Sequence, residues 1–205
     1  MKVQLLSSSS GQPLTLAEIK NHLRLSTGFT TDDTYIQALR DVAREHVEDY
    51  TGQKLRAQTW KLYLDEWPRD KSYDHVTLPF APVQSVPSSG VVYRDAENNS
   101  TTFSSTAWNA DTVSIPGRVV LEYDSDWPSV VLDNDNPISV EFVVGYTTPS
   151  SIPASIKHAM KMLIADMYEF HETKIIGQSV SPLNGGNMRD PVKVLLDKHR
   201  VDYLK

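Results

Sequence analysis

Apolar residues between Ile152 and Thr173 recur at the spacing of a long α-helix. Pro153 stands near the start of this segment, where its missing N–H is one that a helix leaves unpaired in any case. One face carries apolar residues four and three positions apart, namely Ile156, Met160, Leu163, Met167 and Phe170. A second apolar set widens this face, namely Ala159, Met162, Ile164, Ala165 and Tyr168. Because a helix that is apolar over most of its circumference is normally covered by several partners, we expect a central helix with other helices packed around it.

A first N-terminal helix is predicted to run from Leu14 to about Leu25. Thr15 and Glu18 have the spacing of a capping box, and Leu14 and Ile19 stand at the positions of a hydrophobic staple. Residues 1–13 precede it as a flexible or edge-strand lead-in.

A second helix is predicted to follow Thr31-Asp32-Asp33 and to end at Gly52. Its expected buried stripe is Ile36, Leu39, Ala43, Val47 and Tyr50, and its expected solvent face is Arg40, Arg44, Glu45, Glu48 and Asp49.

From Gln58 to Tyr146 the hydrophobic period changes to two, which predicts strands and turns. Alternation is clearest from Gln58 to Leu64 and from Ile138 to Tyr146. Shorter strands are expected at 76–80, 90–94, 101–104, 113–115 and 119–123, with tight turns between them. Short strands at this spacing indicate a small antiparallel sandwich or barrel.

The segment 174–189 shows no periodicity and is predicted to be a long, mobile loop. A last helix is expected to start at Asp190-Pro191 and to cover Val192–Tyr203. Its predicted apolar face is Val194, Leu195 and Val201.

Together these elements predict an α+β fold: a helical bundle core with an inserted antiparallel β-sandwich-like domain. The core would comprise two N-terminal helices, the long central helix and the C-terminal helix. The expected parts are an N-terminal helical part (1–56), the β domain (57–148) and a C-terminal helical part (149–205) that contains the loop 174–189.

The composition of the chain argues against several classes of function. With 205 residues the chain has room for one large or two small domains, and its net charge of −6 argues against a protein that coats nucleic acid. The absence of cysteine excludes disulfides, thiolate zinc sites and cysteine nucleophiles. We find no apolar run long enough to span a membrane and no signal peptide, so we expect a protein made and kept in the cytosol.

The sequence contains few residues that are arranged for metal binding, ligand binding or catalysis. Glu169, His171 and Glu172 are the closest metal-like cluster, but residues two apart on a helix point in different directions, and a solvated helix end explains them. The acidic pairs Asp65-Glu66 and Asp124/Asp126 lie in Trp-Pro loops, where acids are ordinary. Four tryptophans could line a ligand face, although packing is the better explanation: Trp60, Trp67, Trp108 and Trp127. Phosphate-binding glycine motifs and a Gly-x-Ser-x-Gly elbow are absent. We therefore expect neither an enzyme nor a cofactor.

Several segments resemble tailed-bacteriophage head–tail connector (adaptor) proteins, in a long form with a β insertion. They are LTLAEIKxHLR (14–24), Asp32-Asp33 with Ile36, ARxxVExYTG (43–52), FVVGY (142–146), IPxxIKxA (152–159) and Tyr168-Glu169, where x marks a position outside the resemblance. The resemblance covers both ends of the chain, whereas the β block between Gln58 and Asn136 corresponds by position and kind only.

The resemblance implies a dodecameric ring in the virion neck, beneath the portal, assembled in the host cytoplasm. Such a ring extends the DNA channel and docks a stopper or tail-completion protein, and DNA passes through it without sequence-specific binding. The implied partners are further copies of the chain and the portal protein, with no membrane involved. The C-terminal segment would face the portal, which by position gives Ile175, Ile176, Val180, Leu183, Met188 and Arg189 as docking residues.

The residues of the central helix then divide into two groups. The expected core is Ile156, Met160, Leu163 and Met167, and the expected subunit or channel face is Lys157, His158, Lys161 and Glu169. Two other functions stay open: a ligand-binding β-sandwich module for a carbohydrate or peptide, and a hydrolase that uses the acidic loops.

Overall fold

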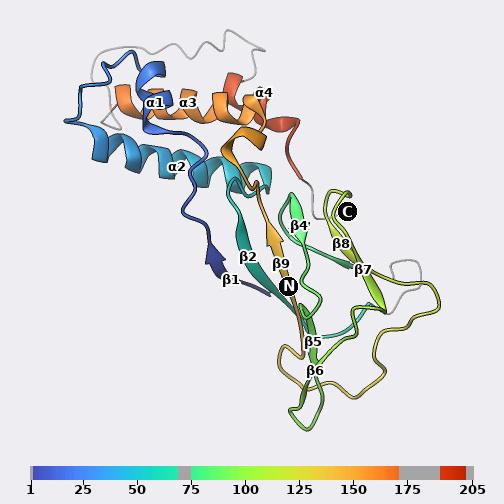
Figure 1. The fold of residues 1–205 in the computed structure, drawn as a ribbon. Coiled ribbons are helices and arrows are strands. Elements are labelled where there is room, and N and C mark those ends of the chain that lie inside the picture. The colour runs from blue at the N-terminus through green and yellow to red at the C-terminus, as the bar shows by residue number, and fades with distance from the viewer. Residues whose placement is uncertain (1, 69–74, 171–189, 202–205) are drawn as a thin grey trace. The chain divides into compact units, whose positions relative to one another are not determined.

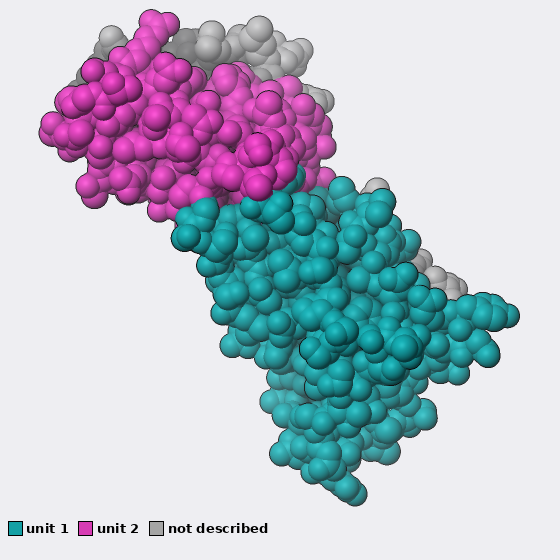
Figure 2. Space-filling model, in the orientation of Figure 1, with its two compact units in different colours: residues 1–11, 56–147, 201–205 teal, residues 12–55, 148–200 magenta. Residues whose placement is uncertain are grey.

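The computed structural model describes residues 2–68, 75–170 and 190–201 (Figure 1). The chain divides into two compact units, shown in Figure 2. Unit 1 comprises residues 1–11, 56–147 and 201–205, and unit 2 comprises residues 12–55 and 148–200. All described strands belong to unit 1 and all described α-helices to unit 2. The predicted α+β class with antiparallel sheets is therefore confirmed.

Unit 1 contains two antiparallel sheets. The larger has the order β1-β2-β9-β5-β6, with β4 also paired to β9, and the smaller has the order β3-β8-β7. The strands of the larger sheet are β1 (Lys2–Ser8), β2 (Gln58–Leu64), β4 (Val83–Ser85), β5 (Val91–Arg94), β6 (Ser100–Thr102) and β9 (Ile138–Val144). Those of the smaller sheet are β3 (His75–Thr77), β7 (Trp108–Asp111) and β8 (Arg118–Leu121).

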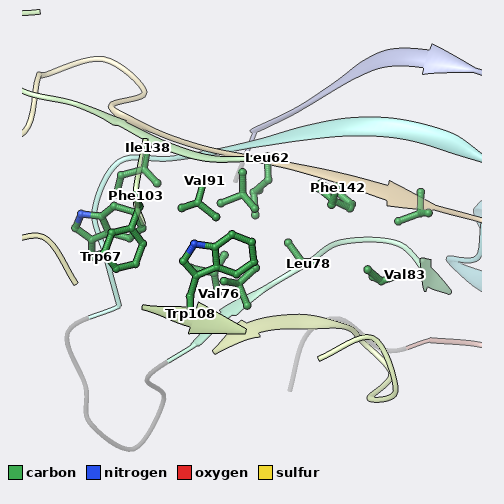
Figure 3. Packing of buried hydrophobic residues seen from close by; sticks show 13 residues of the cluster. Leu62, Trp67, Val76, Leu78, Val83, Val91, Phe103, Trp108, Ile138 and Phe142 are labelled. Carbon is green, nitrogen blue, oxygen red and sulfur yellow. The ribbon is translucent and has the colours of Figure 1, made fainter. Parts of the chain in front are cut away.

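The core of unit 1 is built from one face of each sheet. Strand β9 alternates strictly, with Ile138, Val140, Phe142 and Val144 buried. Figure 3 shows side chains of the larger sheet, such as Leu62 and Phe142, in one cluster with Val76 and Trp108 from the smaller sheet.

Two predictions for unit 1 are wrong. Residues 1–11 belong to this unit rather than to the helical part, because β1 pairs with β2 along its length. The expected strand at Val113–Ile115 is instead a loop, in which the Val113 side chain is 90% exposed. The carboxylate of Asp111 accepts hydrogen bonds from the backbone N–H groups of Val113 (3.1 Å) and Ser114 (3.0 Å) and from Arg118 Nε (2.9 Å). These bonds turn the chain one residue after β7 ends.

Unit 2 contains the helices α1 (Leu16–His22), α2 (Asp33–Thr51), α3 (Ala154–Glu169) and α4 (Pro191–Asp197), and a 3-10 turn, η2 (Pro149–Ser151). The predicted capping box is present at α1, and Gly52 ends α2 with φ 70°. Helix α3 packs against α1, α2 and α4. It is shorter than predicted, as is α4.

The expected core of α3 is wrong at two positions. Ile156 and Met160 are fully buried, but Leu163 and Met167 are half-buried, and Ile164 is fully buried instead. The apolar stripe of α3 is wider than the area that its described neighbours cover, so hydrophobic spacing alone cannot tell which edge of the stripe is buried. For the same reason α4 buries Val192 and Leu196 rather than Val194 and Leu195.

Two charged residues assigned to the solvent face of α2 are buried. Arg44 donates to Gln12 Oε1 (3.4 Å) and to Asp41 Oδ1 (3.2 Å). Glu48 accepts from the backbone N–H of Leu55 at 2.9 Å. Both charges can be buried because each has hydrogen-bond partners in the folded chain.

Candidate assembly surfaces

Glu18 joins α1 to α3. Its Oε2 accepts from the backbone N–H of Thr15 (2.8 Å), and its Oε1 accepts from Lys157 Nζ (2.9 Å). Burial raises the pKa of Glu18, but the hydrogen bonds from Thr15 and Lys157 outweigh this effect and lower the pKa to about 2. Lys157 therefore carries an ion pair inside the subunit, which its place on the polar side of α3 could not reveal.

A basic cluster lies where α1 meets the first half of α3. The rings of His22 and His158 stand edge to face, with their centroids 6.0 Å apart, and both residues are exposed. Burial lowers the pKa of His22, and the positive charges of His158 and Lys161 lower it further. Three basic side chains are thus gathered at this place.

An acidic cluster lies at the other end of α3. Burial raises the pKa of Asp166, and the negative charges of Asp190 and Glu169 raise it further. Helix α3 therefore carries positive charge on its first half and negative charge on its last turn.

Helices α2 and α3 are held together at this same end. Tyr168 donates to Asp32 Oδ2 at 2.6 Å, and Tyr35 donates to the carbonyl of Met167 at 3.3 Å. The N-terminal end of α2 thus meets the C-terminal end of α3, so the two helices run antiparallel.

Helix α4 is fixed by polar contacts that sequence reasoning did not find. Ser155 Oγ lies 2.7 Å from His199 Nε2, and Gln53 Nε2 donates to the carbonyl of His199 at 2.7 Å. Tyr50 donates to Asp197. The sequence indicated the start of α4 through Asp190-Pro191. Asp190 does cap the helix, because its Oδ1 accepts from the backbone N–H of Val192 at 2.9 Å.

The remaining predicted site residues fall into two groups. His158 and Glu169 are exposed and Lys161 is half-buried on α3, so this surface is open to a partner. All the predicted portal-docking residues, namely Ile175, Ile176, Val180, Leu183, Met188 and Arg189, lie outside the described residues, as do His171 and Glu172.

The candidates for other chemistry gain no support. In the described ranges, no group of three or more His, Asp or Glu residues could hold a metal ion. Asp65, Glu66, Asp124 and Asp126 are exposed. Trp67 is buried and stacks on Trp127 with ring centroids 4.7 Å apart, so these tryptophans pack on each other. None of the described helices is long and apolar enough to cross a membrane.

The residues from α1 to just beyond β6 are similar to a known family. Residues 13–105 match the family model of the phage gp6-like head–tail connector protein. This part of the chain, a little under half of its length, is similar to the gp6-like head–tail connector family. The sequence resemblance is thereby confirmed, and the matched region includes α1, α2 and strands β2 to β6. A search of curated proteins finds no significant match to the connector chain.

Solved structures share the fold of the whole chain. A chain in the neck of an empty gene transfer agent particle, computed with C6 symmetry, has a TM-score of 0.78 at 23% identity. A chain in the virion of a native gene transfer agent particle has a TM-score of 0.74 at 22% identity. A chain in the neck of a native particle, computed with C12 symmetry, has a TM-score of 0.70 at 20% identity. Each match covers 100% of this chain and 98% of the other, so the connector shares their fold.

Proposed function

We propose that this connector is a structural protein of the virion neck of a tailed phage, where twelve copies form a ring under the portal. One observation carries the proposal: the fold matches, over the whole chain, that of chains in particle necks computed with C6 and C12 symmetry. The family match over residues 13–105 supports the same role.

In this proposal the helical unit forms the body of the ring, and the segment 174–189 docks on the portal. The opposite side of the ring receives a stopper or tail-completion protein. DNA passes through the channel without sequence-specific binding. The net charge of −6 supports this, because a negatively charged wall repels the phosphate backbone. The ring assembles in the host cytoplasm, and we expect no catalytic activity.

The test is to mix the purified connector with portal rings encoded in the same genome and to measure the mass of the complex. We expect a portal that carries one closed ring of connector. A connector that stays monomeric by itself and also fails to bind the portal would contradict the proposal. A control with the portal of an unrelated phage should show no binding.

The ligand-binding alternative is not retained. It depended on tryptophans that present a face to a ligand, whereas Trp67 and Trp108 are buried in the core of unit 1.

A further inference from the structure

Helix α3 presents an outward row of side chains opposite its buried face. The row is His158, Met162, Ala165 and Glu169, at spacings of four, three and four residues, with Lys161 at its edge. This is the spacing at which one helix contacts another helix along its length. His158 and Glu169 are exposed, and Lys161, Met162 and Ala165 are half-buried. The row thus has an apolar centre and charged ends.

Helix α2 presents a second outward row with the same spacing. It comprises Ala38, Val42, Glu45 and Asp49, all of which are exposed, and Val42 is 52% exposed. Glu45 forms an ion pair with Arg44 of its own helix, at 3.7 Å, and its side chain is 72% exposed. This row has an apolar half, Ala38 and Val42, and an acidic half, Glu45 and Asp49.

The charges on both rows oppose the dipoles of their own helices. A helix favours acids in its first turn and bases in its last turn, at about 0.3–1 kcal/mol each. Helix α3 starts with Lys157 and His158 and ends with Glu169, and neither α2 nor α3 has a base in its last turn. Lys157 is neutralised by Glu18, whereas His158, Glu169 and Asp49 form no ion pair with other described residues. The charge pattern is therefore unfavourable within one subunit.

We propose that the outward row of α3 packs antiparallel against the outward row of α2 on the next copy of the connector. His158 then lies opposite Asp49, and Met162 lies opposite Glu45, whose carboxylate reaches Lys161. Ala165 lies opposite Val42 and Glu169 opposite Ala38. In this alignment the basic end of the α3 row, His158 with Lys161 at its edge, meets the C-terminal end of α2, where the helix dipole is negative. The antiparallel pair thus places the acids on the C-terminal half of α2 beside the bases on the first half of α3.

The geometry of the two rows suits a ring rather than a twofold dimer. Within unit 2, α2 and α3 contact each other through their buried faces, so the two outward rows point away from each other. An interface between two different patches of one molecule is heterologous, and it closes into a ring under cyclic symmetry. The inference rests on the proposed function, and it names the surfaces that hold neighbouring subunits together.

Cysteine cross-linking tests this contact, since the natural chain contains no cysteine. The double variant V42C/A165C, assembled on portal rings and oxidised, should give a ladder of covalent oligomers that ends at the closed ring. Each single variant should give no ladder, because position 42 meets position 165 and not itself. The pair V42C/K193C serves as the matched control, since Lys193 is exposed on α4, outside both rows.

Each outcome of the cross-linking experiment supports or contradicts the proposed interface. A ring that forms without a ladder from V42C/A165C overturns the interface and leaves the proposed function intact. Dimers from A165C alone show an α3–α3 contact, which also overturns it. A wild-type connector that fails to assemble on the portal refutes the proposed function and the interface together.

Charge exchange gives a second test that does not depend on oxidation. E45K alone and K161E alone should each weaken assembly about tenfold, and the double variant E45K/K161E should recover most of the loss. Equal weakening by all three variants, with each subunit folded, would contradict the pairing.

Discussion

Replacement of Glu18 by Gln should destabilise the helical unit by about 1 kcal/mol. The amide oxygen of Gln can still accept from Thr15, but the change removes a negative charge from the first turn of α1, worth about 0.3–1 kcal/mol, and a partly exposed ion pair with Lys157, worth about 0.5 kcal/mol. A pKa lowered from 4.5 to about 2 corresponds to about 3 kcal/mol. The Glu18 side chain is 34% exposed, so solvent screening reduces this figure, and the sum of the separate contacts is the better guide.

The sign of the pH dependence follows from the lowered pKa. Glu18 stabilises the fold when it is ionised, so its contribution is complete above pH 4.5 and is lost as the pH falls toward 2. The E18Q variant should therefore differ from the natural protein at pH 7 and converge with it near pH 2.

Urea unfolding followed by circular dichroism at 222 nm measures this difference, because the signal comes mainly from the helices. The variant D49N is the matched control, since Asp49 is an exposed acid without an ion pair among the described residues; its stability should change by less than about 0.5 kcal/mol. A double-mutant cycle with K157M should give a coupling of about 0.5 kcal/mol. An E18Q variant as stable as the natural protein at pH 7 would refute this account of how α1 is held to α3.

Three further predictions concern other parts of the chain. Ile164→Ala should cost about 2–4 kcal/mol and Leu163→Ala about 1 kcal/mol, because only Ile164 is fully buried; equal losses in urea unfolding would contradict this. Asp166→Asn should raise the melting temperature at pH 7 but not at pH 3, because the raised pKa of Asp166 means that its ionised form destabilises the fold; a lowered melting temperature at pH 7 would count against this. Gly117→Ala should destabilise unit 1 by about 1–3 kcal/mol, because the new Cβ would lie 2.5 Å from Val83 Cγ2; tryptophan fluorescence during unfolding measures the loss, and an unchanged midpoint would contradict the contact.

Local signals predicted the elements whose structure depends on neighbours in the sequence. Thr15 and Glu18 lie three residues apart and form the capping box that their spacing predicts. Gly52 adopts the left-handed conformation that ends α2, and the alternation in β9 matches its burial at every position. The division of the chain into helical and strand blocks could also be predicted, because apolar residues recur about every 3.6 residues in a helix and every two residues in a strand.

Contacts between distant segments set the limits of the sequence prediction. Arg44 and Glu48 have a helical position that faces water in an isolated helix, yet folding buries both beside partners. The pair of Glu18 and Lys157 spans 139 positions in the sequence, so Lys157 could not be distinguished from Lys161 on pattern alone. Val113–Ile115 has the composition of a strand, but Asp111 stabilises a loop there.

These findings change which residues should be altered to test assembly. Reversal of Lys157 would break an ion pair within the subunit, so loss of assembly in that variant would have two explanations. Lys161 makes no ion pair with another described residue, and its reversal therefore tests the outer surface of α3 more cleanly.

The most direct test of the proposed function is electron cryomicroscopy of the connector mixed with portal rings from the same genome. The account predicts one closed ring of twelve connector subunits beneath the portal, with the α3 row of each subunit against the α2 row of the next. Portal rings that carry no connector density would contradict the proposed function.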